Sequence, residues 1–175
     1  MRLFPHQIDA LKSTENCNRV AYYHDMGLGK TYTGGEKMVR LGASINLVIC
    51  QKSKISDWIE HLVEHYPEYV NYNLTHKSDF NEFFKYHSTR EFKVNCIINY
   101  ELVFRRPELS ELRNFTLLLD ESSLIQNEQA KRSKFILRKL QPDNVILLSG
   151  TPTGGKYENL YSQLRLLGWD ISKTT

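Results

Sequence analysis

The sequence is poor in cysteine, and its cysteines are not arranged as metal ligands or disulfide partners. Cys17, Cys50 and Cys96 are odd in number, lie far apart and include no CxxC pair, so neither a zinc site nor a disulfide framework is indicated. Cys50 and Cys96 each end an apolar run. We therefore expect these two residues to be reduced, buried thiols.

Long hydrophobic runs and a strong net charge are absent as well. No apolar run approaches the roughly 18 residues that a membrane-spanning helix needs. The start MRLFPHQIDA lacks the features of a signal peptide, and we expect a cytoplasmic protein. The net charge is +3 with a pI near 8.7, well below that of a protein that coats nucleic acid. Any contact with DNA or RNA must therefore use a localised groove.

The chain alternates between short apolar runs and amphipathic stretches, without repeats or a linker. Its 175 residues, 41% of them hydrophobic, suffice for a sizeable core, and we predict a single domain over residues 1–175. Several apolar runs are nearly continuous, as in strands buried on both faces, which predicts an α/β fold with a mostly parallel sheet flanked by helices on both faces. The predicted strands span residues 19–23, 45–50, 69–74, 92–99, 115–120 and 144–149, and the predicted helical stretches span 31–41, 54–65, 79–87, 100–112, 128–140 and 157–167.

A glycine-containing loop follows the first predicted strand, at the edge of the sheet where ligands bind in open parallel sheets. In this segment, HDMGLGKTYT, Gly29, Lys30 and Thr31 form the end of the Walker A pattern, although His24 stands where that pattern has its first glycine. A strand, this loop and then a helix would offer backbone N–H groups to an anion. The loop therefore predicts a triphosphate site, in which Lys30 would reach the β- and γ-phosphates and Thr31 would hold Mg²⁺. The alternative is a structural turn.

The fifth predicted strand delivers two carboxylates at its end, Asp120 and Glu121. An apolar strand followed by Asp-Glu is the Walker B arrangement, in which Asp120 would bind Mg²⁺ and Glu121 would polarise the attacking water. The alternative is a helix N-cap followed by a solvated glutamate. Because this pair and the glycine loop both occur at strand ends, together they favour a nucleotide site.

Two further segments fit such a site. Ser149, Gly150 and Thr151 follow the sixth predicted strand, and small hydroxyl residues suit a loop that senses the γ-phosphate, although a plain turn is the simpler interpretation. Near the start, Gln7 carries an amide that can pair with N6 and N7 of adenine, as side-chain amides do in DNA recognition. That contact would favour ATP over GTP. The alternative is a solvated helix residue.

Taken in order, these segments resemble the first RecA-like lobe of superfamily 2 helicases, specifically of the Swi/Snf-type DNA-dependent ATPases. The sequences PHQ, DMGLGKT, LVICQKS, INYEL, LLLDESSLIQN and LLSGTPTGG are similar to the family's Q motif and motifs I, Ia, Ib, II and III. The resemblance extends from Leu3 to about Gly168 and implies a RecA-like P-loop NTPase domain. The chain departs from the family's pattern at His24, where an acidic residue is usual, and at Ser122 and Ser123, where many relatives have Gly-His or Ala-His.

The resemblance implies ATP and Mg²⁺ as cofactors. It also implies DNA, most simply a duplex held by its phosphate backbone, as the partner. Backbone contacts of this kind position a protein without reading sequence. The residues so implied are Gln7, Asp25, Met26, Gly27, Leu28, Gly29, Lys30 and Thr31 for the nucleotide, Thr31 and Asp120 for the metal, Lys30, Asp120 and Glu121 for catalysis, Lys52, Ser53 and Tyr100 for DNA, and Ser149, Gly150 and Thr151 for coupling.

Motors of this superfamily bind ATP between two lobes, and the second lobe supplies an arginine finger. No arginine-rich motif VI can be found in the sequence, because Arg105, Arg106 and Arg165 lie in predicted helical stretches of the first lobe. We therefore expect a fragment whose site is completed by a second RecA-like lobe, most simply in the full-length chain. An arginine finger is worth about 10³ to 10⁵ in rate for related reactions, so the lobe alone is expected to bind ATP weakly and hydrolyse it negligibly.

Two other functions stay open from the sequence alone. One is a different P-loop NTPase that acts without nucleic acid, against which Gln7 and the motifs Ia, Ib and III argue. The other is a non-catalytic nucleic-acid-binding module with this fold, against which the intact Lys30 and Asp120 argue. Five cations also crowd the predicted helix at 128–140. A solvated face is the simpler interpretation of these cations, and an auxiliary DNA patch is the alternative.

Overall fold

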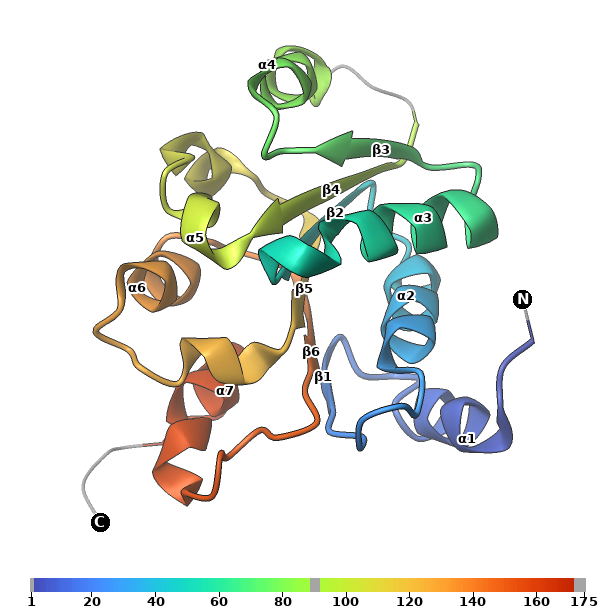
Figure 1. The fold of residues 1–175 in the computed structure, drawn as a ribbon, viewed down its shortest axis with the longest axis vertical. Helices are drawn as coiled ribbons and strands as arrows, with labels where there is room; N and C mark the ends of the chain where they lie inside the picture. Colours follow the sequence, from blue (N-terminus) through green and yellow to red (C-terminus); the bar gives the residue numbers. More distant parts are fainter. Residues whose placement is uncertain (1, 89–91, 172–175) are drawn as a thin grey trace.

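A six-stranded sheet forms the centre of the computed structural model, which describes residues 2–88 and 92–171 (Figure 1). The strand order is β1-β6-β5-β2-β4-β3, and all the pairings are parallel. The α/β fold with a parallel sheet is therefore confirmed, and every predicted strand is present. The strands are β1 (Arg19–Tyr22), β2 (Ile45–Cys50), β3 (Val70–Asn73), β4 (Val94–Asn99), β5 (Phe115–Asp120) and β6 (Asn144–Leu148).

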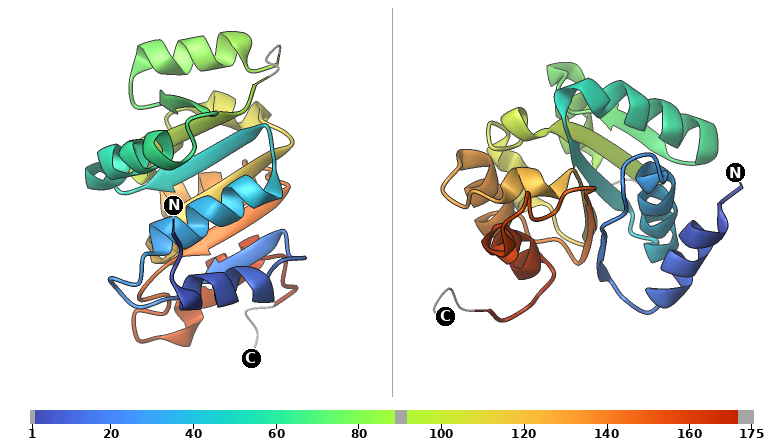
Figure 2. Two further views of the ribbon diagram at one scale, coloured as in Figure 1. Left: turned by 90° about the vertical axis from the view of Figure 1, so that its right-hand side faces the viewer. Right: turned by 60° about the horizontal axis from the view of Figure 1, so that its bottom comes forward.

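Helices cover both faces of this sheet, which is seen nearly edge-on in Figure 1. The helices α1, α2 and α3 lie on one face, and α5, α6 and α7 lie on the other (Figures 1 and 2). The helices are α1 (Pro5–Ser13), α2 (Lys30–Leu41), α3 (Ile55–His65), α4 (Lys77–Tyr86), α5 (Tyr100–Val103), α6 (Lys131–Arg138) and α7 (Tyr161–Leu166), with the short 3₁₀ helices η1 (Lys52–Lys54), η2 (Pro107–Glu111), η3 (Ser122–Ile125) and η4 (Tyr157–Leu160).

The predicted helical stretch 100–112 is divided in the structure. Helix α5 ends at Val103, and η2 begins at Pro107. Proline has no N–H to donate and disfavours a helical conformation in the residue before it, and Arg106 accordingly has a non-helical backbone (φ −121°, ψ 69°). Within residues 2–88 and 92–171, no helix combines the length and the apolar character that crossing a bilayer requires.

The central strands are buried on both sides because successive side chains point to opposite faces. In β5, Phe115, Leu117 and Leu119 enter the hydrophobic cluster under α4 to α7, whereas Leu118 enters the cluster under α1 to α3. All four side chains are fully buried. This double burial explains the continuous apolar run that predicted the strand.

Helix α2 lies close against the sheet, and this placement fixes where its first residue, Lys30, emerges. A Cβ atom added at Gly34 would approach Leu148 Cδ1 on β6 to 2.7 Å, a distance that real contacts do not show. Glycine therefore lets the helix pack directly on β6. The same helix is tied to its neighbours by polar contacts on its outer side.

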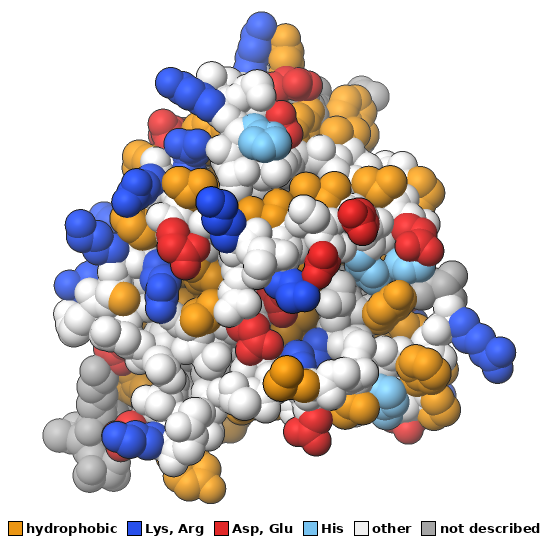
Figure 3. Space-filling model, in the orientation of Figure 1, with side chains coloured by type: hydrophobic (Ala, Val, Ile, Leu, Met, Phe, Trp, Pro, Cys, Tyr) orange, Lys and Arg blue, Asp and Glu red, His pale blue; other side chains and the backbone are white. Residues whose placement is uncertain are grey.

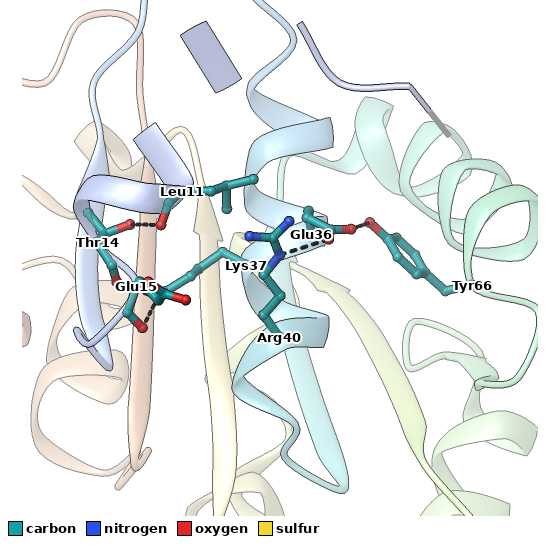
Figure 4. Close-up of polar contacts among 7 residues, drawn as sticks. All are labelled: Leu11, Thr14, Glu15, Glu36, Lys37, Arg40 and Tyr66. Atoms are coloured by element: carbon teal, nitrogen blue, oxygen red, sulfur yellow. Dashed lines mark hydrogen bonds and ion pairs between the residues drawn. The ribbon is translucent and has the colours of Figure 1, made fainter. Parts of the chain in front are cut away.

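Those contacts involve two adjacent charged residues of α2 (Figure 4). Lys37 is 2% exposed, and its Nζ donates a hydrogen bond to the Thr14 carbonyl oxygen at the end of α1 (2.7 Å). Burial lowers the pKa of Lys37 below its ordinary value. Next to it, Glu36 forms an ion pair with Arg40 (2.8 Å) and accepts a hydrogen bond from the Tyr66 hydroxyl (3.0 Å), which follows α3. Helix α2 is thus attached to both flanking helices.

Three asparagines form a row across the strands β2, β4 and β3. Asn46 Nδ2 donates to Asn95 Oδ1 (2.9 Å), and Asn95 Nδ2 donates to Asn71 Oδ1 (3.0 Å). Asn46 and Asn95 are fully buried. Buried amides are costly without partners, and these amides pair with one another. The row therefore links three strands by hydrogen bonds in addition to those of the backbone.

A pH dependence of stability follows from His61 on α3. Its ring is 7% exposed and packs edge-on against Tyr32, with 4.7 Å between ring centroids. Burial lowers the pKa of His61 from 6.5 to about 4. The unfolded chain takes up this proton at a higher pH than the folded chain does. The stabilisation that the neutral ring contributes to the free energy of unfolding is therefore complete above pH 6.5 and is lost as pH falls towards 4. Between pH 7 and pH 5 we expect a loss of about 2 kcal/mol from this group.

The measurement is the free energy of unfolding in urea at pH 7 and pH 5, for the wild type, for His61→Gln and for His76→Gln. His76 is an exposed histidine just before α4 and serves as the control. His61→Gln should lose less stability than the wild type over this interval, whereas His76→Gln should behave as the wild type does. Equal losses in all three proteins would contradict the assignment.

Candidate functional site

A cleft of about 710 Å³ lies at the carboxyl ends of the strands β1, β2, β5 and β6. It brings together residues from both predicted nucleotide segments and from the loop after β6, although these lie far apart in the sequence. Its volume is in the range of small-molecule sites. The lining residues are Met26, Gly27, Gly29, Lys30, Thr31, Gln51, Lys54, Asp57, Trp58, Asp120, Glu121, Ser123, Leu124, Gly150 and Thr151.

The glycine loop between β1 and α2 forms one wall of the cleft. Gly27 and Gly29 have left-handed backbones (φ 82° and 69°), which glycine adopts without steric cost. Helix α2 starts directly after Gly29, so its first N–H groups are available to an anion. Lys30 Nζ donates to the carbonyl oxygens of His24 (3.2 Å) and Asp25 (3.4 Å). The left-handed glycines, the free N–H groups and the charge of Lys30 are features that suit an anion, and phosphate binding by this loop stays a prediction.

Gln7 holds this loop through hydrogen bonds on the side away from the cleft. Its side chain is 1% exposed, and its Nε2 donates to the carbonyl oxygens of Leu28 (3.3 Å) and Gly29 (3.1 Å), while its Oε1 accepts from the Phe4 N–H (2.8 Å). Both atoms of the amide are therefore engaged within the chain, and Gln7 does not line the cleft. The adenine contact predicted for Gln7 stays a prediction, and it would require the amide to exchange some of these bonds.

Asp120 ends β5 and faces the glycine loop across the cleft. Its Oδ2 accepts a hydrogen bond from the Trp58 indole Nε1 of α3 (2.9 Å). Burial raises the pKa of Asp120, and the Trp58 hydrogen bond and the Lys30 charge offset only part of this increase. A divalent cation would remove the remaining cost of this partly buried negative charge. Asp120 and Thr31, which line the same cleft, thus fit the metal-holding role predicted for them.

Glu121 has a left-handed backbone (φ 54°, ψ 60°), which is uncommon for any residue other than glycine. Such conformations cost of order 1–3 kcal/mol and occur frequently at functional sites. The carboxylate accepts a long hydrogen bond from Ser149 Oγ (3.4 Å), and the same Oγ accepts one from the Thr151 N–H (3.1 Å). The acidic pair is therefore connected to the predicted coupling loop, which contains Ser149, Gly150 and Thr151.

The structure corrects one predicted DNA contact. Tyr100 is fully buried, and its hydroxyl donates to the carbonyl oxygens of Asp120 (2.8 Å) and Glu121 (3.4 Å). A side chain without exposed surface cannot touch a phosphate, so the side-chain contact with DNA expected for Tyr100 is wrong. The residue instead holds the backbone of the acidic pair. Lys52 and Ser53 are exposed on η1, and their contact with DNA stays a prediction.

Sequence reasoning assigned no role in the cleft to Trp58, Lys54 or Asp57. Nothing in the local pattern of Trp58 signals a bond to a residue 62 positions away. Lys54 and Asp57 form an ion pair at the cleft (2.8 Å). Their spacing of three residues, which brings two side chains onto one face of a helical turn, was the available signal.

Comparison with known proteins identifies the family. The chain matches the SNF2-related domain over residues 11–175. It belongs to the SNF2-related family. Among its SNF2 relatives, the ISWI chromatin-remodeling complex ATPase ISW2 of Saccharomyces cerevisiae is 29% identical over 155 residues, and the SWI/SNF-related matrix-associated actin-dependent regulator of chromatin subfamily A-like protein 1 of Drosophila melanogaster is 27% identical over 159. These alignments cover 84% and 85% of this chain but only 14% and 19% of the relatives, so the chain spans less than a fifth of their length.

A solved SNF2 structure confirms the fold. The Sulfolobus solfataricus SWI2/SNF2 ATPase core in complex with dsDNA superimposes with a TM-score of 0.78, at 24% sequence identity, over 95% of this chain and 36% of that one. The recognition of a Swi/Snf-type RecA-like lobe from sequence is therefore confirmed. Membership of the SNF2 family implies ATP as the nucleotide, which agrees with the geometry of the glycine loop.

The Trp58 hydrogen bond should strengthen metal-dependent binding of nucleotide. Trp58→Phe keeps an aromatic ring but removes the N–H, which leaves the partly buried Asp120 carboxylate short of a donor and raises its pKa further. We expect the affinity for ATP with Mg²⁺ to fall about 5- to 30-fold. Any change of this loss between pH 8 and pH 6 should be towards a greater loss at pH 6, because lower pH favours protonation of a carboxylate whose pKa is raised.

Isothermal titration calorimetry of the chain at both pH values provides the measurement. Trp169→Phe is the matched control, because that indole is 62% exposed and does not line the cleft. Unchanged affinity of Trp58→Phe at both pH values would show that the hydrogen bond does not support the site.

Proposed function

We propose that this chain is the ATP-binding lobe of a DNA-dependent motor of the Swi/Snf type, which couples ATP hydrolysis to movement on, or remodelling of, duplex DNA. The observation that carries the proposal is the cleft in which the glycine loop with Lys30 faces Asp120 and Glu121. A cation-bearing loop and a carboxylate pair on opposite walls are the two halves of a Mg²⁺-dependent phosphoryl-transfer site.

Each residue has a role in this mechanism. The backbone of the loop and Lys30 would bind the phosphates, and Thr31 and Asp120 would hold Mg²⁺. The metal would neutralise the charge that develops on the phosphate oxygens. Glu121 orients the attacking water and withdraws its proton. Trp58 and Tyr100 keep the two carboxylates in place through the contacts described above.

A basic surface over α5 and α6 supports DNA as the partner. Figure 3 shows Lys and Arg side chains gathered on the left of the view, over these two helices. No acidic residue occurs in α6. The shallow hollow between the helices is lined by three cations, Arg105, Lys131 and Arg132, together with Phe104, Ala130 and one carboxylate, Glu101. We define the α5–α6 basic surface by Arg105, Lys131, Arg132, Lys134 and Arg138. Cations grouped in this way bind the phosphate backbone without reading sequence.

The isolated lobe is expected to bind ATP weakly and to hydrolyse it negligibly. Among the described residues, none of those lining the cleft is an arginine, so the charge of the transition state would not be fully stabilised. An arginine finger contributes about 10³ to 10⁵ in rate to related reactions. We propose that a second RecA-like lobe, most simply in the same full-length chain, supplies this group.

Equilibrium binding of ATP and GTP with Mg²⁺ tests the site. The wild type should bind ATP, and Lys30→Ala should lose about 10- to 100-fold in affinity, because a charge-assisted contact with phosphate is removed. Gln7→Ala should lose affinity for ATP and GTP alike, since the amide supports the loop. Asp9→Ala, an exposed change on the same helix, is the control.

The outcomes separate the alternatives. A loss restricted to ATP in Gln7→Ala would favour the adenine contact over loop support. Binding that is indifferent to Lys30→Ala would contradict the nucleotide site and favour a non-catalytic module. Tight binding with rapid hydrolysis by the chain alone, without DNA, would favour a different kind of P-loop NTPase.

Duplex DNA binding tests the α5–α6 basic surface. Binding should weaken with salt, with a slope close to −0.9 per phosphate contacted. Replacing Lys131 and Lys134 together by alanine should make this slope about 1 to 2 units shallower for any DNA sequence. Fluorescence anisotropy at several salt concentrations measures it.

The matched control replaces Lys12 on α1 and Lys93 just before β4, both exposed, and so removes the same charge. An equal change in both double variants would show that only net charge matters. That result would argue against a defined DNA surface on α5 and α6.

A further inference from the structure

Gln163 on α7 carries a buried amide that joins three separate segments of the chain. The side chain is fully buried. Its Oε1 accepts hydrogen bonds from Ser122 Oγ (2.6 Å) and from the Tyr23 hydroxyl (3.0 Å), and its Nε2 donates to the Pro152 carbonyl oxygen (2.9 Å). Burial raises the pKa of Tyr23 to about 12, so this hydroxyl keeps its proton and remains a donor.

Each of the three partners is next to a part of the nucleotide cleft. Tyr23 precedes His24, whose carbonyl oxygen accepts from Lys30 Nζ (3.2 Å). Ser122 directly follows Glu121, and Pro152 follows Thr151, which lines the cleft. Gln163 itself does not line the cleft. Its contacts therefore connect the walls of the cleft from the side away from the nucleotide.

The segment after β5 and the loop after β6 are connected in two ways. The direct connection is the hydrogen bond from Ser149 Oγ to the Glu121 carboxylate, which is long at 3.4 Å. The connection through Gln163 uses shorter bonds in a fully buried setting. Buried hydrogen bonds are costly to break when no water can replace them, so the path through Gln163 is the more constraining of the two.

We propose that Gln163 is a positioning residue: when nucleotide and metal bind, it transmits a rearrangement at the acidic pair, Asp120 and Glu121, to the loop after β6. The inference rests on the proposed function, because it needs nucleotide in the cleft. Gln163 acts through Ser122 and Pro152 and contacts no reacting group. Its amide supplies an acceptor on one side and a donor on the other, and both are required to hold the two segments in one arrangement.

Hydrogen–deuterium exchange of the backbone amides of residues 151–155, measured with and without ATP and Mg²⁺, tests the proposal on this chain. In the wild type, saturating nucleotide should slow exchange in the loop about tenfold. Gln163→Leu removes both the acceptor and the donor at similar size. It should keep its ATP affinity within about threefold of the wild type, whereas the slowing in the loop should fall below about twofold.

The ratio of exchange rates with and without nucleotide distinguishes coupling from a purely structural role. A structural role would speed exchange equally in both states and leave the ratio unchanged. Ser122→Ala breaks the same path from its other end and is the milder change if Gln163→Leu folds poorly. The variant that combines Gln163→Leu with Ser122→Ala should reduce the ratio of exchange rates no further than the stronger single variant does, because both changes act on one path.

Ser162→Ala is the matched control, since Ser162 is equally buried on the same helix and its hydroxyl has no hydrogen-bond partner among the described residues. It should keep the wild-type ratio. A wild-type ratio in both Gln163→Leu and Ser122→Ala would overturn the role of Gln163 while leaving the nucleotide site intact. Absence of ATP binding by the wild type would instead overturn the proposed function itself.

Discussion

The hydrogen bond between the Trp58 indole and the Asp120 carboxylate is the contact around which the site is arranged. It joins α3 to the carboxylate at the end of the central strand β5, which lines the cleft together with the glycine loop. Partial burial alone would favour the neutral acid, and the Trp58 N–H and the charge of Lys30 offset part of that effect. The position of Lys30 therefore matters as much as that of Asp120.

The position of Lys30 is set by contacts made well outside the cleft. Gly34 lets α2 pack closely on β6, Lys37 attaches α2 to α1, and Gln7 holds the carbonyl oxygens of the loop. These contacts restrict the loop before any ligand arrives, and preorganised donors cost little reorganisation when charge develops near them. The glycine loop is therefore held by contacts on several sides of the cleft wall that it forms. The loop after β6 is attached instead through side chains, such as Gln163, that reach several segments.

Local patterns predicted the strands and the glycine loop between β1 and α2 well, because both are encoded by neighbouring residues. The apolar runs matched the six strands to within two residues at each end, and the motif with Lys30 is contiguous. Contacts between distant residues could not be found in this way: Ser122 and Gln163 are 41 positions apart, and neither lies in a pattern that indicates a bond. Tyr100 was misassigned for the same reason, since its burial under the acidic pair depends on how β4 and β5 are placed.

The asparagine row across β2, β4 and β3 has a consequence for assembly of the sheet. In the native pairing Asn95 lies opposite both Asn46 and Asn71. A strand β4 that paired one residue out of step would turn Asn95 to the opposite face and leave buried amides among apolar side chains. The row thus penalises misaligned pairing during folding. Correct register keeps the carboxyl ends of the strands aligned with one another, and the cleft lies at these ends.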